Sequence, residues 1–208
     1  MSIIAAGNTI NTGLTYSADQ TGNLAITAVN ALTLQTGSNT ATLPAATGTV
    51  MVSGNMPTFA AYNNVASFSV SNATNTILPA DTKEWDTLGA FNNTASTATL
   101  NGLSVPAYSF MPNIPGYYQF NFQVWCPNSS GGPLVSKLMK NGSQYRVGSI
   151  FLMSGTTNYI SAGSGIVYMN GTTDYVNVNI YQGSGSTQNC NNASVSYNYI
   201  NGVLIRSA

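Results

Sequence analysis

Aromatic side chains alternate along one short stretch of this 208-residue chain, and no other feature restricts its fold as strongly. The stretch reads FMPNIPGYYQFNFQV, from Phe110 to Val124. A proline and a glycine break the chain, and then every second side chain is large and apolar. Successive side chains of a β-strand point to opposite faces, so this period of two predicts a half-buried strand. Its core face is predicted to carry Tyr118, Phe120, Phe122, Val124 and Cys126.

The same period recurs further along the chain. It is clear in DYVNVNIY, from Asp174 to Tyr181, and in the closing SVSYNYINGVLIRSA, which we predict to be a strand inside the domain. Turn dipeptides such as Asn141-Gly142 lie between these runs, and few windows show helical spacing. Short half-buried strands between frequent turns are typical of antiparallel sandwiches and barrels. We therefore predict an all-β protein.

The charge content excludes several classes of function. Charged residues make up 5% of the chain, and five basic side chains balance five acidic ones. No basic patch is available to neutralise phosphates, so we expect no nucleic-acid partner and no binding to an anionic membrane. A surface solvated by Asn, Ser and Thr has little self-repulsion and tolerates association. The composition therefore predicts a member of an assembly.

The chain divides into two regions of different composition. Residues 1–56 contain isolated apolar residues between Thr, Asn and Gly, with short alternations such as Leu32 and Leu34. Similar alternations occur at Leu24 and Ile26, and at Val50 and Val52. Such strands lack the apolar mass for an independent core, so we predict an attachment or trimerisation segment, the alternative being a disordered tail. Residues 57–208 are richer in aromatic residues and form the predicted main domain.

The spacing of the aromatic stretch resembles the central signature of C1q-like domains. That signature is carried here by Leu103, Phe110, Gly116, Tyr118, Phe120 and Phe122. Further segments agree in order: PTFAAYNN, LMKNGSQY, SGIVYMNGTTDYVNVNIYQGSG and YNYINGVLIR. The resemblance covers residues 57–208 and implies a ten-stranded jelly roll of the tumour-necrosis-factor type that assembles as a trimer. The chain departs from the family at Ala98, where Asn or Asp is expected, so the segment from 91 to 103 should differ most.

A second resemblance concerns the N-terminal region. The stretch NALTLQTGSNTATLPAATGTVMVSGNMP is similar to segments of bacteriophage structural proteins, in which a Thr- and Ala-rich stretch ends in a hairpin. Together the two resemblances imply a trimeric protein of the phage particle, assembled in the host cytoplasm. It would be a capsid decoration protein or head fibre, or a short tail fibre that binds a host surface glycan or protein. Capsid or tail proteins would hold residues 1–56.

The alternative is a secreted C1q-like protein that recognises a ligand. The opening MSIIAAGNTINTG has no positive region followed by an apolar run, so we expect no secretory signal. No collagen-like repeat is present either, and no run of about 18 apolar residues predicts a membrane helix. These observations favour the phage interpretation.

Exposed aromatic residues are the candidates for contacts. Three tyrosines on the second faces of predicted strands are candidate trimer contacts, namely Tyr117, Tyr175 and Tyr181. The two tryptophans, Trp85 and Trp125, are candidate glycan contacts, because an indole face stacks on apolar sugar faces. Trp125 alternates away from the Phe120 face, which favours its exposure. The alternatives are that the tryptophans serve packing and that the tyrosines are ordinary surface residues.

The residues of common catalytic sites are missing from the sequence. The chain has no histidine, which excludes Ser-His-Asp and Cys-His mechanisms and the commonest metal ligand. We predict no enzyme activity, no catalytic residues and no cofactor. One acidic cluster, Asp81, Glu84 and Asp86, is a candidate calcium site, but a solvated loop with a local ion pair is the favoured interpretation. Cys126 and Cys190 are interpreted as buried apolar residues in preference to a disulfide.

Overall fold

The structure is a computed structural model that describes residues 32–36, 39–43, 56–64, 67–127, 131–153, 158–191 and 197–208. The chain divides into two compact units, Met1–Thr47 and Gly48–Ala208, so the boundary at residues 56 and 57 stays a prediction. The described part of the first unit is a hairpin of β1 (Leu32–Thr36) and β2 (Asn39–Leu43), in which Leu32 pairs with Leu43. The alternations predicted at Leu24–Ile26 and Val50–Val52 lie outside the described residues.

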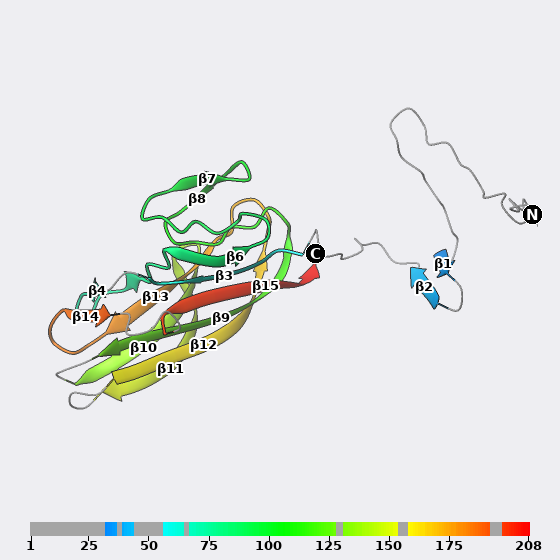
Figure 1. Cartoon of the computed structure of the whole chain (residues 1–208). Helices are drawn as coiled ribbons and strands as arrows, with labels where there is room; N and C mark the ends of the chain where they lie inside the picture. The colour runs from blue at the N-terminus through cyan, green and yellow to red at the C-terminus, as the bar shows by residue number, and fades with distance from the viewer. Residues whose placement is uncertain are drawn as a thin grey trace, which may run out of the picture. The chain divides into compact units, whose positions relative to one another are not determined.

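Two antiparallel sheets form the second unit (Figure 1). The five-stranded sheet consists, in spatial order, of β12 (Asn158–Met169), β9 (Gly116–Pro127), β15 (Tyr199–Ser207), β3 (Thr58–Tyr62) and β6 (Thr82–Asp86). The four-stranded sheet consists of β11 (Ser143–Met153), β10 (Gly132–Lys140), β13 (Val176–Gln182) and β5 (Thr76–Ile77). No helix occurs among the described residues, in agreement with the all-β prediction.

The order of the strands makes this sandwich a jelly roll. The chain crosses from one sheet to the other between β9 and β10, between β11 and β12, between β12 and β13, and again before β15. Within the two large sheets, as far as the structure describes them, β10 and β11 are the one pair joined as a hairpin, around the predicted Asn141-Gly142 turn, where both residues have positive φ (51° and 77°). The first strand, β3, lies beside the last strand, β15. The prediction of a jelly-roll sandwich is therefore confirmed.

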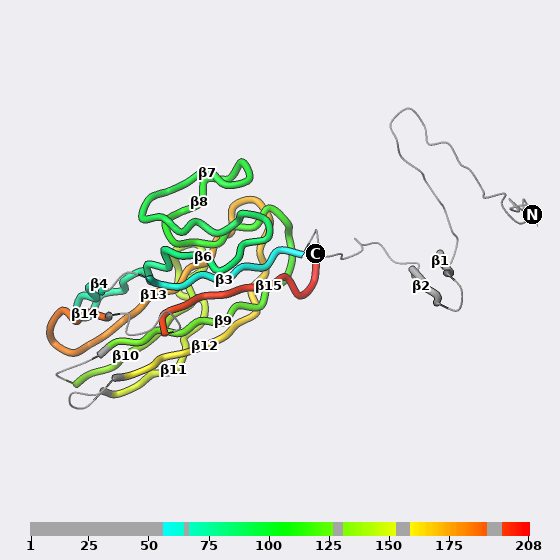
Figure 2. Tube along the Cα trace, in the orientation of Figure 1, coloured from blue at the N-terminus to red at the C-terminus, as the bar shows by residue number. Residues whose placement is uncertain are grey.

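Two short two-stranded sheets complete the domain (Figure 2). One pairs β4 (Ser67–Val70) with β14 (Gln188–Asn191), and the other pairs β7 (Ala98–Leu100) with β8 (Leu103–Val105). The chain begins β3 at the end of the sandwich where β15 finishes, since the Leu204 amide donates to the Pro57 carbonyl at 2.9 Å. The β4–β14 pair lies at the other end (Figure 1). We call these the proximal and the distal end.

An aromatic cluster fills the space between the sheets. Phe59 of β3 is stacked between Phe91 and Phe110, with ring centroids 4.9 Å and 4.4 Å away. Phe110 also meets the edges of Tyr118 and Phe120 from β9, at 5.6 Å and 5.9 Å. All five side chains have no exposed surface. The alternation that predicted the buried face of β9 therefore describes the centre of the core.

Close packing at this cluster explains one glycine of the closing strand. A Cβ at Gly202 of β15 would lie 2.7 Å from the Phe59 ring and 2.8 Å from the Phe120 ring. Any larger residue would push those rings apart.

The other residues of the C1q-like signature differ in burial. Gly116 and Phe122 are buried, whereas Leu103 is only half-buried in the β7–β8 hairpin.

The sheets come together where β11 lies beside β12. Serine hydroxyls join them: the Ser136 amide donates to Ser161 Oγ at 2.8 Å, and the Ala162 amide donates to Ser149 Oγ at 2.9 Å. Glycine allows this approach, since a Cβ at Gly163 would lie 2.8 Å from the Cα of Gly148. Small side chains therefore replace apolar ones along this edge of the sandwich.

A disulfide joins Cys126 and Cys190, so the interpretation of these residues as free cysteines is wrong. The bridge links the end of β9 to β14 across 64 residues of sequence, with the two Cα atoms 4.4 Å apart. Both side chains are buried. The sequence carried no signal for this pair, because the two residues approach only when the β4–β14 sheet closes over the distal end of β9.

A partly buried ion pair links the turns at the proximal end. Lys140 Nζ lies 2.9 Å from Asp174 Oδ2, and Asn141 Nδ2 donates to Asp174 Oδ1 at 2.7 Å. Burial by itself would raise the pKa of Asp174. The hydrogen bonds from Lys140 and Asn141, the positive charge of Lys140 and the amide of Asn170 together lower it below its ordinary value of 3.8.

We predict that Asp174→Asn lowers the free energy of unfolding by roughly 1–3 kcal/mol at neutral pH, because it breaks charge-assisted hydrogen bonds. A carboxylate whose folded pKa is lowered stabilises the protein above its unfolded pKa, and this contribution disappears as pH falls through the folded pKa. The difference from wild type should therefore shrink below about pH 4 in urea unfolding measured across pH. Glu84→Gln, at an exposed carboxylate, is the control. A difference that persists unchanged in acid would contradict the assignment.

Candidate interaction surface

The outward face of the five-stranded sheet carries apolar side chains at its proximal end. Strand register places Tyr117 of β9 opposite Tyr168 of β12, with ring centroids 5.4 Å apart. The next row joins Ile166 to Gln119 and then to Val203 of β15. Ile205 of β15 is also exposed. We call Tyr117, Ile166, Tyr168, Val203 and Ile205 the apolar face.

Uncharged amides continue this face toward the distal end. The third row contains Ser164, Asn121 and Asn201, and Asn121 Nδ2 donates to Asn201 Oδ1 at 3.0 Å. Across β3, β9, β12 and β15 the only charged residue is Arg206. A sheet face that normally meets water carries charged side chains, which keep neighbouring molecules apart. This face instead combines exposed rings with side chains that can be desolvated at modest cost, which is typical of contact surfaces.

A second apolar surface lies on the edge strand of the other sheet. At the distal end of β11, three consecutive residues are exposed: Ile150 (63%), Phe151 (43%) and Leu152 (78%). Val147 of the same strand is exposed as well. We call these four residues the apolar edge. Among the described residues β11 is an edge strand, with backbone pairing to β10 and serine contacts to β12 at Ser149.

The three tyrosines predicted as trimer contacts do not lie together. Tyr117 belongs to the apolar face. Tyr181 lies on β13 in the other sheet, where Lys137 Nζ sits 4.7 Å from its ring centroid. Tyr175 precedes β13 and its amide donates to Asn141 Oδ1 at 2.9 Å. Sequence reasoning missed the rest of the apolar face, although the alternation in β12 and β15 would have indicated Ile166 and Val203.

The two tryptophans differ in exposure. Trp85 of β6 is 49% exposed, and its Nε1 donates to Thr58 Oγ1 at 3.3 Å. Trp125 is buried, so the expectation that it is exposed is wrong. The strand alternation does direct Trp125 away from the core, but the ring of Tyr197 covers it at a centroid distance of 5.6 Å. A sugar therefore finds no free face on Trp125 within one chain.

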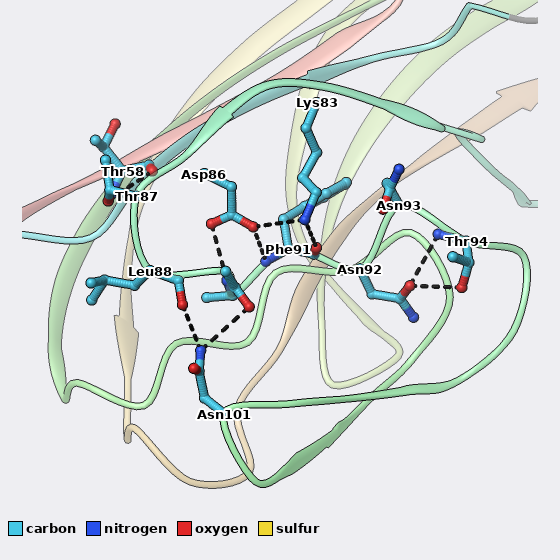
Figure 3. Close-up of polar contacts among 12 residues, drawn as sticks. Thr58, Lys83, Asp86, Thr87, Leu88, Phe91, Asn92, Asn93, Thr94 and Asn101 are labelled. Atoms are coloured by element: carbon cyan, nitrogen blue, oxygen red, sulfur yellow. Dashed lines mark hydrogen bonds and ion pairs between the residues drawn. The ribbon is translucent and has the colours of Figure 1, made fainter.

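The three acids of the cluster have different partners, and Figure 3 shows those of Asp86. Asp86 accepts hydrogen bonds from the amides of Ala90 and Phe91, both at 3.0 Å, and pairs with Lys83 Nζ at 3.1 Å. Asp81 Oδ1 accepts from the Asn64 amide at 2.7 Å. Glu84 is exposed. In the part of the chain that the structure describes, no group of three Asp, Glu, Cys or His side chains converges to hold a metal ion.

The loop between β6 and β8 is organised by amides as well as by Asp86. Asn101 Nδ2 donates to the carbonyl of Leu88 at 2.7 Å, and the buried Asn92 accepts from the amide and the hydroxyl of Thr94 (Figure 3). Asn92 Nδ2 also donates to three backbone carbonyls of residues 96–106. This segment contains Ala98, where the sequence departs from the C1q-like pattern.

No protein-family model matches the sequence, and no curated protein matches it. Among solved structures, murine APRIL at pH 5.0 is similar over 73% of this chain and 100% of that chain, with a TM-score of 0.49 and 10% identity. Eiger TNF from S. frugiperda is similar over 74% and 93%, with a TM-score of 0.46 and 10% identity. These likenesses concern the fold alone, and neither bears on a bacteriophage origin. Among the described residues, no helix has the length and apolar character needed to cross a membrane.

Proposed function

We propose that this protein is a non-enzymatic structural component of a bacteriophage particle. Three copies associate through residues 57–208 and display the jelly-roll head. Residues 1–56 attach it to capsid or tail proteins, as a decoration protein, a head fibre or a short tail fibre. The observation that carries the proposal is the apolar face: exposed rings on strands β9, β12 and β15, which with β3 carry a single charge, Arg206.

Two different apolar surfaces on one domain favour a ring over a simple pair. A surface that contacts its own copy produces a two-fold dimer, whereas a surface that contacts a different surface of the next copy produces a ring or a filament. The apolar face and the apolar edge are two such surfaces, on different sheets. Docking the edge of one copy on the face of the next covers both, and a closed three-fold ring leaves neither exposed.

The disulfide indicates that the protein functions in an oxidising environment and not in a reducing cytoplasm. Disulfides persist in oxidising surroundings, including virion surfaces and the extracellular space. Cys126 and Cys190 form one between buried side chains. This bridge fits a released phage particle, and it equally favours the second candidate function, a secreted C1q-like protein that recognises a ligand.

Charge introduced into the apolar face should break the assembly. We predict that Ile166→Asp converts the trimer into single folded chains, because each contact would bury an unpaired carboxylate. Sedimentation velocity measures the mass, and the β-sheet circular dichroism spectrum reports the fold. Thr99→Asp, on the exposed β7–β8 hairpin, adds the same charge elsewhere and should leave the trimer intact. If Ile166→Asp remains trimeric, the apolar face is not the contact surface.

The location of the protein separates the two candidate functions. Mass spectrometry of particles purified by density gradient should detect this chain at a fixed number of copies per particle. The secreted alternative predicts the chain free in the medium and absent from particles, and that result would refute the phage proposal while leaving the trimer untouched.

A further inference from the structure

A shallow pocket opens at the β6 edge of the five-stranded sheet, beside the amide row that continues the apolar face. It lies where β6, β3 and β15 meet and has a volume of about 200 Å³. Ala60 of β3 forms its floor, with Trp85 of β6 on one side and Asn201 of β15 on the other, as the strand register shows. The pocket exists because alanine is the small residue in a row between two larger ones.

The walls of the pocket combine an aromatic platform with polar groups. The half-exposed indole of Trp85 is oriented by its hydrogen bond to Thr58. Tyr62 and Tyr199 are directly paired across β3 and β15 and line the distal side. Glu84 occupies the bulge in β6 beside Trp85, and no hydrogen bond or ion pair of its carboxylate occurs within the described residues. The ring face, the carboxylate and the phenols therefore surround one small space.

We propose that this pocket binds one neutral sugar unit of a glycan. A pyranose presents an apolar face of C–H groups, which suits the Trp85 ring, and a rim of hydroxyls that both donate and accept hydrogen bonds. Glu84 accepts such bonds, the tyrosine hydroxyls both donate and accept, and Asn201 contributes an amide whose Oδ1 already accepts from Asn121. The volume is below the roughly 300–1,000 Å³ of sites for drug-sized ligands, which matches a single ring.

The charge and the openness of the pocket select among ligand classes. The Glu84 carboxylate repels acidic sugars, so a neutral hexose is favoured over a uronic acid. A quaternary ammonium ion also pairs with carboxylates and aromatic rings, but it needs rings that enclose it. Trp85, Tyr62 and Tyr199 make no ring–ring contact with one another in the described structure and line an open depression. A sugar stacked on one face fits this arrangement better.

The position of the pocket suits a displayed head. Tyr62 ends β3 and Tyr199 begins β15, so the pocket lies toward the distal end, whereas the apolar face lies toward the proximal end. Each chain contributes a complete pocket. The inference deepens the proposed display function and rests on it only for avidity, since three weak sites on one trimer bind a glycan-coated surface far more tightly than one site.

Binding can be measured on the full-length protein with monosaccharides. D-glucose, D-galactose, L-rhamnose and N-acetylglucosamine are titrated separately, with glucuronic acid and choline chloride as contrasting probes. The chain has two tryptophans, so a Trp125→Phe variant leaves Trp85 as the only indole reporter of fluorescence. Saturation-transfer NMR on the wild type provides the same information without any substitution. At least one neutral sugar should bind, shift the Trp85 emission and bind equally well at high salt.

Two substitutions then test the site itself. Trp85→Ala should weaken sugar binding by at least about tenfold, with the assembled mass unchanged. Tyr181→Ala, which removes a ring from the other sheet, is the matched control and should bind normally. Glu84→Gln should weaken sugar binding only several-fold, because an amide oxygen still accepts hydrogen bonds.

Every outcome distinguishes this inference from the proposed assembly. If single chains bind sugar, the sugar site is supported and the proposed trimer is refuted. A trimer that binds none of the four neutral sugars would overturn the sugar site and leave the assembly standing. The same holds if the trimer binds choline instead and the Glu84→Gln variant no longer binds choline. If the Trp85→Ala variant still binds sugar as wild type does, the sugar-binding site lies elsewhere on the molecule, which contradicts the proposal.

Discussion

Phe110→Ala should lower the free energy of unfolding by about 3–5 kcal/mol, a large fraction of the stability of an ordinary domain. The Phe110 ring has no exposed surface and touches the rings of Phe59, Tyr118 and Phe120. Its backbone also pairs with the four-stranded sheet: its amide and carbonyl exchange hydrogen bonds with Val176 of β13, at 2.9 Å and 3.0 Å. Truncation therefore leaves a cavity at the point where the segment before β9 crosses the core.

Guanidinium unfolding at one fixed protein concentration measures this loss, because association adds to the apparent stability of the assembled protein. Phe151→Ala, which truncates the same ring type on the apolar edge, is the matched control for the single chain. Measured in the Ile166→Asp background, it should cost well under the Phe110 value, because Phe151 is 43% exposed. Equal losses at the two positions would contradict the placement of Phe110 at the centre of the core.

Removing the disulfide should have an effect of similar size. For a bridge that spans 64 residues, the chain-entropy estimate gives about 4 kcal/mol of stabilisation. We predict that the double variant Cys126→Ala, Cys190→Ala folds with the same sheet content and unfolds at a markedly lower guanidinium concentration. Thermal unfolding followed by circular dichroism gives an independent measure.

Reduction supplies the control for this experiment. Wild type that is unfolded and refolded in excess dithiothreitol should fall to the stability of the double variant, whereas the double variant should not respond to the reductant. If the variant is as stable as oxidised wild type, the bridge does not constrain the chain and the distal end is closed by packing alone.

The alternation in the sequence was sufficient to predict β9, β13, β15 and the rings that β9 places in the core. Tyr118, Phe120 and Phe122 are buried because a period of two leaves a strand only one way to hide its rings. The Asn141-Gly142 turn is equally local, since its positive φ angles suit those two residue types. Both predictions depend on neighbours in the chain, which is why the sequence alone could make them.

Predictions that depend on distant segments were harder. Trp125 points outward as the alternation requires, but Tyr197 covers it from a segment 72 positions later. The cysteine pair needs the β4–β14 sheet to close over β9, and no spacing rule indicates that. The same holds for the pocket, because Ala60, Trp85 and Asn201 become neighbours only through strand register.

The acidic cluster was a candidate calcium site, but the favoured interpretation of Asp81, Glu84 and Asp86 was a solvated loop with a local ion pair. The ion pair is present, between Lys83 and Asp86. In the structure Asp86 turns inward to accept from the loop amides, and Asp81 accepts from the segment after β3. Asp81 lies before β6, and the bulge in β6 breaks the alternation between Glu84 and Asp86, so the three acids have different surroundings.

The mass of the wild-type protein in solution tests the central claim most directly. Light scattering coupled to size exclusion, repeated over a range of concentrations, should give three times the 21.7 kDa mass of one chain. The mass should not change with salt, because the contact surface carries almost no charge. A species of one chain mass at every concentration, with the apolar face in water, would contradict the account.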